Sequence, residues 1–146
     1  MNLSREAKRV SGITLLAVPT IMYGGVTLLG ILTTGRAGTS SGNLVLDETQ
    51  WALFRAGHAH AGVWVLLSLV IQVLLDSATL SRMLKWLTRI AAPLAAVAVS
   101  GGFFGLAYNS SFKWLLYFGA ACLVLVVLLT GIGLLRTPNV PGHRGA

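Results

Sequence analysis

Two histidines in the segment Arg55-Ala-Gly-His-Ala-His-Ala-Gly62 are the residues best suited to chemistry in this chain. His58 and His60 are two positions apart, so on a helix with 100° per residue their side chains point about 200° from each other. Histidines that chelate one metal ion from a helix are spaced four residues apart. A closed metal site that uses both histidines therefore requires other helices, a second subunit or a break in the helix.

The two histidines also lie within a long apolar stretch. Counting about 1.5 Å per residue from Trp51 places them roughly 10–14 Å inside the hydrocarbon, if this stretch crosses a bilayer. Ionisable groups at that depth are rare, and they face a neighbouring helix or a wet cavity. Imidazole can ligate a haem iron or a metal ion, meet a quinone headgroup or carry a mobile proton. The position of the two histidines is compatible with each of these four roles and with simple packing between helices.

Helical spacing assigns His58 to a polar face of this stretch, which we expect to pack inside a bundle. The other residues on that face are Arg55, Gly62, Gln72 and Asp76. The guanidinium of Arg55 could pair with a haem propionate, a quinone oxygen or another anion. His60 falls on a different side of the helix, nearer Trp64, and is left free to face another subunit.

Residues on other parts of the apolar sequence could help to form the pocket. Tyr23, Ser100 and Cys122 lie at compatible depths on the other stretches. Gly57 and Gly62 are small enough to let a neighbouring backbone approach. All five are therefore predicted to line a pocket or to pack around it.

A haem with two axial ligands would need a partner for His58, because no second membrane histidine shares its face. Met22 or a residue from another subunit could supply that ligand. Since Arg55 is one turn away from His58 and not from His60, we predict that His58 matters more for any bound cofactor or proton-linked behaviour.

Packing is the main alternative to chemistry, because histidine side chains can form hydrogen bonds between helices. The sequence contains no nucleophile with a neighbouring base, no carboxylate pair and no phosphate-binding loop. Its only acids are Glu6, Asp47, Glu48 and Asp76, none deep in an apolar stretch, so a carboxylate proton relay is not supported. We therefore expect no independent enzymatic activity.

Four long stretches without Asp, Glu, Lys or Arg must position these residues: 10–35, 56–75, 90–112 and 114–135. A spanning helix needs about 20 residues, and backbone groups inside hydrocarbon must be paired internally. The sequence therefore predicts an all-α integral membrane four-helix bundle. The expected spans are about 10–34, 51–75, 88–108 and 114–135, with Pro19 and Pro93 inside the first and third helices.

The basic residues predict the orientation. The net charge is +7, but most Lys and Arg residues flank the apolar stretches, which argues against a nucleic-acid-binding face. The richer side holds Arg5, Lys8, Arg9, Arg82, Lys85, Arg89, Arg136 and Arg144. By the positive-inside rule both termini are cytoplasmic, with residues 1–9 before the first span and 136–146 forming a disordered tail.

The Arg55–Gly62 segment resembles the start of the second span in a family of small, uncharacterised bacterial four-span membrane proteins. The resemblance runs from the first to the fourth helix and implies the same fold, but it implies no activity. The His-Ala-His element is also similar to histidine-bearing helices of haem-copper oxidases and NnrS-like membrane haem proteins. This second resemblance places haem first among the cofactors that the histidines could bind.

We therefore expect a multi-pass protein of the bacterial cytoplasmic membrane with a buried site at His58, His60 and Arg55, for haem or a transition metal. The histidines themselves would be the metal ligands. One alternative is a cofactor-free accessory subunit or homo-oligomeric scaffold, and a second is proton or ion handling. The expected partners are the lipid bilayer and either further copies of the chain or the other subunits of a membrane complex.

Overall fold

The chain forms four long helices in a computed structural model. The structure describes residues 3–36 and 46–136, and it describes side chains at 3–30 and 46–136. They are α1 (Arg5–Arg36), α2 (Glu48–Ser77), α3 (Arg82–Leu106) and α4 (Lys113–Leu135), with a short 3₁₀ helix, η1 (Ser110–Phe112), before α4. All four are long and apolar enough to cross a membrane. The predicted all-α four-helix architecture is confirmed, whereas the expected disordered tail falls almost entirely outside the described residues.

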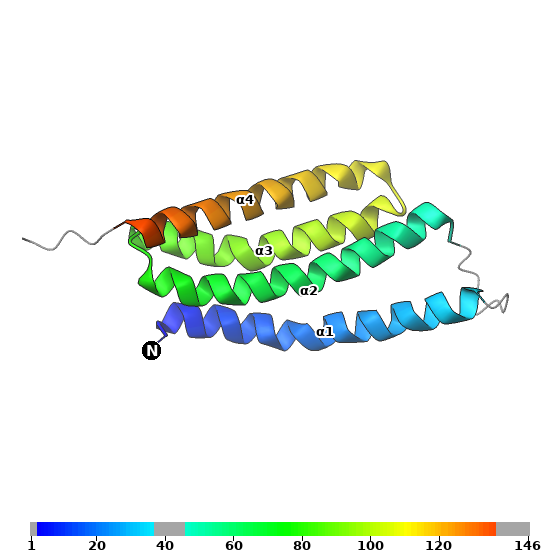
Figure 1. Cartoon of the computed structure of the whole chain (residues 1–146), viewed down its shortest axis with the longest axis horizontal. Coiled ribbons are helices and arrows are strands. Elements are labelled where there is room, and N and C mark those ends of the chain that lie inside the picture. The colour runs from blue at the N-terminus through cyan, green and yellow to red at the C-terminus, as the bar shows by residue number, and fades with distance from the viewer. Residues whose placement is uncertain (1–2, 37–45, 137–146) are drawn as a thin grey trace, which may run out of the picture.

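The helices run up and down, so that the start of α1 and the end of α4 lie at the same end of the bundle (Figure 1). We call this end, which also holds the end of α2 and the start of α3, the terminal end. The most extensive contacts join α3 to α4 and to α2, whereas α1 packs chiefly along α2. Helix α1 is therefore the least enclosed element of the bundle.

Local sequence signals set the helix boundaries. Asp47 and Gln50 form a capping box, in which the Asp47 carboxylate accepts from the Gln50 backbone N–H and the Gln50 side chain accepts from the Asp47 N–H. Ser81 caps α3 by accepting from the Leu84 N–H. Pro19 and Pro93 lie inside α1 and α3 without ending them, as expected from the sequence.

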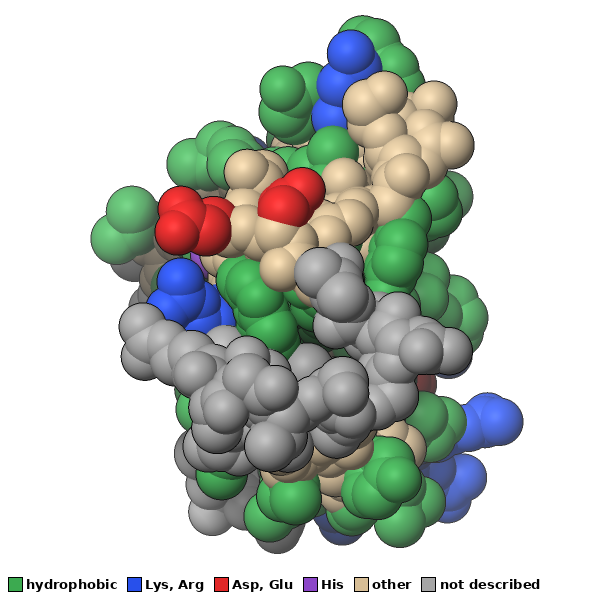
Figure 2. Space-filling view, turned by 90° about the vertical axis from the view of Figure 1, so that its right-hand side faces the viewer, with side chains coloured by type: hydrophobic (Ala, Val, Ile, Leu, Met, Phe, Trp, Pro, Cys, Tyr) green, Lys and Arg blue, Asp and Glu red, His purple; other side chains and the backbone are tan. Residues whose placement is uncertain are grey.

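The burial pattern differs from that of a water-soluble bundle, because many large apolar side chains are exposed while several polar ones are enclosed. Exposed apolar residues on the four helices include Leu16, Val26, Leu66, Val97 and Leu125. Hydrophobic side chains also cover much of the outline seen from the end opposite the terminal end (Figure 2). A surface of this kind suits contact with lipid.

Two apolar clusters fill the interior between α2, α3 and α4. One contains Ile71, Leu75, Ala78, Ala92 and Val126, and the other contains Ala95, Val99 and Leu123. Trp64, Phe103, Leu116 and Cys122 pack around the second cluster. The interior is thus built largely from α2, α3 and α4, and side chains on α2 that face α3 become enclosed.

Candidate functional site

His58 faces α1. A Cβ atom built on Gly25 would lie 2.7 Å from both Cε1 and Nε2 of the His58 ring, so the imidazole occupies the space that a side chain at that position would need. His58 is half-buried, and it has no hydrogen-bond partner among the described residues. The expected inward direction of His58 is therefore confirmed, with the backbone of α1 directly against the ring.

The remainder of the predicted His58 face is only partly enclosed. Gln72 is completely buried, as expected, but Arg55 is exposed and Gly62 has open space where a side chain would be. The expectation that Arg55 and Gly62 pack inside the bundle is wrong. Arg55 has no counter-charge among the described side chains, and a guanidinium without one is costly to bury. Arg55 and His58 therefore do not form a closed pocket.

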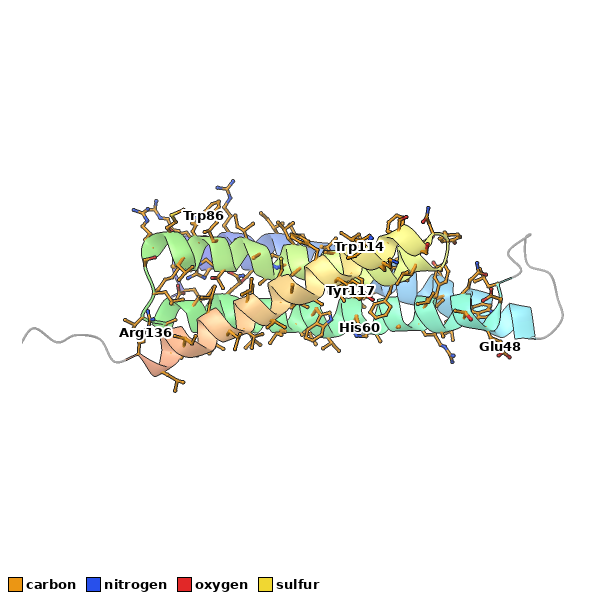
Figure 3. All side chains as sticks on the ribbon, turned by 90° about the horizontal axis from the view of Figure 1, so that it is seen from above. Glu48, His60, Trp86, Trp114, Tyr117 and Arg136 are labelled. Atoms are coloured by element: carbon orange, nitrogen blue, oxygen red, sulfur yellow. The ribbon has the colours of Figure 1, made fainter. Side chains whose placement is uncertain are left out.

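His60 faces α3. Its ring lies against Phe103 with the centroids 4.6 Å apart and an interplanar angle of 33°, and the ring of Trp64 lies 6.0 Å away. Figure 3 shows His60 near the middle of the long axis of the bundle. The predicted divergence of the histidines is confirmed, because His58 contacts α1 and His60 contacts α3. His60 packs within its own chain rather than standing free for another subunit.

A hydrogen bond fixes the tautomer of His60. Nδ1 lies 2.7 Å from the backbone carbonyl oxygen of Ala56. A carbonyl can only accept, so Nδ1 carries the proton and donates it to this bond. The lone pair of the neutral ring is then on Nε2, which is the atom that can bind a proton or a metal ion.

His60 begins a row of polar residues that follows α2 at four-residue intervals. The row consists of His60, Trp64, Ser68, Gln72 and Asp76. Because each step of four residues turns about 40° around the helix, the last two members of the row also belong to the face predicted for His58. Contacts with Phe103 at one end and with Arg89 at the other show that the row follows α3. The row therefore leads from the middle of the bundle to its terminal end along the α2–α3 interface.

At the terminal end the row meets a buried cation. Arg89 forms an ion pair with Asp76 and donates to the Gln72 backbone carbonyl at 2.8 Å, while the Gln72 side-chain amide donates to the Arg89 carbonyl at 2.9 Å. The Arg89 side chain is only 4% exposed. Asp76 also accepts the backbone N–H of Ser4 at 2.9 Å, which ties the start of α1 to α2 and α3.

The sequence did not reveal this cluster. Arg89 was interpreted as an interfacial charge that sets the orientation, because it stands at the start of an uncharged stretch. Its proximity to Asp76 depends on the tight turn between α2 and α3, which brings two residues 13 positions apart into contact. One feature of the sequence could have predicted the ion pair: Asp76 and Arg89 carry opposite charges on the two sides of the short connection between α2 and α3.

The remaining predicted pocket residues do not gather around either histidine. Tyr23 and Met22 are exposed on α1, and Ser100 is buried but donates to the Ala96 carbonyl of its own helix at 2.9 Å. Cys122 packs against the cluster of Ala95, Val99 and Leu123. Gly57 is buried against the ring of Phe104, 3.1 Å from where its Cβ would be. Gly57 and Cys122 thus have packing roles in this structure.

The described residues contain no group of three or more His, Cys, Asp or Glu side chains placed to hold a metal ion. The two histidines also point to different helices. The described part of one chain therefore does not bring two histidine ligands together at one metal ion. A tetrahedral or octahedral ion would need its other ligands from elsewhere.

Comparisons of the chain with protein families, with curated proteins and with solved structures found no match. Chemistry is therefore assigned from the side chains of the α2–α3 interface alone.

Proposed function

We propose that this chain is a multi-pass protein of the bacterial cytoplasmic membrane that handles protons through the polar row of α2, with His60 as the group that takes up and releases the proton. The observation that carries the proposal is the row itself, which runs from His60 to the Asp76–Arg89 ion pair at the terminal end. Polar and ionisable groups placed in sequence along a span are typical of proton routes, because they are costly to keep in hydrocarbon.

The chemistry at His60 needs no other reactant. Protonation of Nε2 converts the neutral ring to imidazolium, and loss of the same proton restores it, while Nδ1 keeps its bond to the Ala56 carbonyl. Imidazole is suited to this exchange because its second ring nitrogen can accept a proton while the first keeps its own. The rings of Phe103 and Trp64 lie beside His60, and an aromatic face stabilises a neighbouring cation. No enzymatic reaction is proposed.

The proposed orientation places the terminal end in the cytoplasm. Arg89 contributes less to this argument than the sequence suggested, because its charge is paired inside the bundle. The terminal end still carries Arg5, Lys8, Arg9, Arg82, Lys85 and Arg136 on described residues. Of the labelled aromatic residues, Trp86 lies near the terminal end, where an interfacial aromatic belt would place it (Figure 3).

The test is proton flux into vesicles that contain the purified protein and carry a pH gradient. We expect flux above that of protein-free vesicles, a loss of that flux in His60→Ala, and retention in the matched variant His58→Ala. Equal flux in all three proteins, or no flux above that of empty vesicles, contradicts the proposal. Circular dichroism and gel filtration of each variant in detergent establish that the bundle is intact.

A haem or transition-metal ion on the α2 histidines is the second candidate. It is favoured by the bond from His60 Nδ1–H to the Ala56 carbonyl, since ligating histidines commonly hold their second nitrogen in this way. The further ligands would come from another copy of the chain or from a partner subunit. We favour His60 over His58 as the ligand, because the backbone of α1 lies against Nε2 of His58.

An absorption spectrum and a metal analysis of protein expressed with haem and metals supplied test this candidate. Stoichiometric haem or metal that is lost in His60→Ala supports it, and protein without either contradicts it. Failure of both candidates leaves the third proposal, a cofactor-free accessory subunit or homo-oligomeric scaffold.

A further inference from the structure

Two polar atoms in the middle of the α2 row are buried without a partner among the described residues. They are the hydroxyl oxygen of Ser68 and the indole nitrogen of Trp64. Ser68 is only 1% exposed, so its hydroxyl is not reached by bulk solvent or by lipid. Buried polar atoms are almost always hydrogen-bonded, to protein or to ordered water.

Ser68 differs in this respect from every other buried hydroxyl on the described residues. Thr14, Thr88, Ser100 and Thr130 each donate to the carbonyl four residues earlier, at 2.7 to 2.9 Å. This local bond is the usual way in which a helix satisfies a hydroxyl in an apolar setting. Ser68 does not make it, so its hydroxyl remains available for a ligand between the helices.

The surroundings of these atoms offer no protein partner. Trp64 packs against the cluster of Ala95, Val99 and Leu123, which carries no polar side-chain atom. Ser68 lies one turn further along the row, between Trp64 and Gln72. An indole N–H can only donate, and a hydroxyl can both donate and accept, so water can pair with either atom.

We propose that Trp64 and Ser68 bind internal water at the α2–α3 interface. The water accepts the Trp64 N–H and exchanges a hydrogen bond with the Ser68 hydroxyl. The role of this water rests on the proposed function. The water fills the interval between His60 and the Gln72–Arg89–Asp76 cluster, so that hydrogen-bonding groups continue from the middle of the bundle to its terminal end.

The test is water-edited solid-state NMR of the indole N–H of Trp64 in bilayers, assigned with Trp64→Phe. We expect a strong cross-peak to water in the wild type, reduced several-fold in Ser68→Ala and unchanged in Ser100→Ala. Ser100 is the matched control because it is also buried but its hydroxyl is bonded within its own helix. A wild-type Trp64 signal without a water cross-peak, and with slow exchange in D₂O, overturns the inference.

The same samples separate this inference from the proposed function. A water cross-peak together with flux that is insensitive to His60→Ala supports the water site and contradicts proton handling. Flux that depends on His60 without water at Trp64 supports proton handling and contradicts the water site. A cross-peak that survives in Ser68→Ala at full strength also contradicts the site as proposed, because Ser68 would then not hold the water.

Discussion

Replacing Asp76 by Asn removes the only carboxylate that faces the buried guanidinium of Arg89 among the described residues. The substitution preserves shape and an oxygen that can accept the Ser4 N–H, so the change is chiefly one of charge. Removing one partner of a buried ion pair costs about 3–5 kcal/mol. The Arg89 side chain is 4% exposed and that of Asp76 is 18% exposed, so solvent reaches the carboxylate side and the lower limit applies. We expect a loss of about 3 kcal/mol in the free energy of unfolding.

Reversible unfolding in mixed micelles, followed by circular dichroism, measures this loss. The matched control is Arg82→Gln, which removes an exposed charge at the same end of the bundle and should change stability by less than about 0.5 kcal/mol. The double variant Asp76→Leu with Arg89→Met should recover most of the lost stability, because no uncompensated charge is left inside. A loss below about 1 kcal/mol in Asp76→Asn would show that the pair behaves as a solvated surface pair and would refute the reasoning.

Three further predictions concern α1, the two histidines and the orientation. Gly25→Ala places a methyl group 2.7 Å from the far end of the His58 ring, which must turn aside, so this variant should be less stable than Gly24→Ala by up to about 1 kcal/mol. Gly24→Ala meets nothing within 4 Å and should be neutral or stabilising; equal effects would contradict the contact. In protein supplied with haem and metals, His60→Ala should reduce any bound cofactor more than His58→Ala, and the opposite order would support the prediction made from the sequence, that His58 matters more. A reporter fused at residue 80 should be cytoplasmic, and a periplasmic reporter there would reverse the proposed orientation.

The sequence predicted the elements well because their causes are local. Long uncharged stretches defined the four helices, and the Asp47 side chain caps α2 from the position just before the helix. The divergence of His58 and His60 also followed from helix geometry alone, without knowledge of any neighbour. In each case the deciding information lay within a few residues.

The neighbours of the candidate residues could not be predicted in this way. That His58 meets Gly25, and that His60 meets Phe103, depends on how α1 and α3 pack against α2. The placement of Arg55 outside the bundle was missed for the same reason, since helical spacing assigns a face but does not say how far the neighbouring helix covers it. Arg89 was missed because a basic residue at a helix end has two ordinary roles, topology and pairing.

The central claim, that His60 takes up a proton on Nε2 while its Nδ1–H stays bonded to the Ala56 carbonyl, is tested most directly by ¹⁵N NMR of histidine-labelled protein in bilayers. His58→Gln removes the other membrane histidine and assigns the signals. We predict that neutral His60 is the Nδ1–H tautomer and that Nε2 is the nitrogen that gains a proton on acidification. An Nε2–H tautomer of the neutral ring, or a ring that gains no proton at Nε2 on acidification, would contradict the claim.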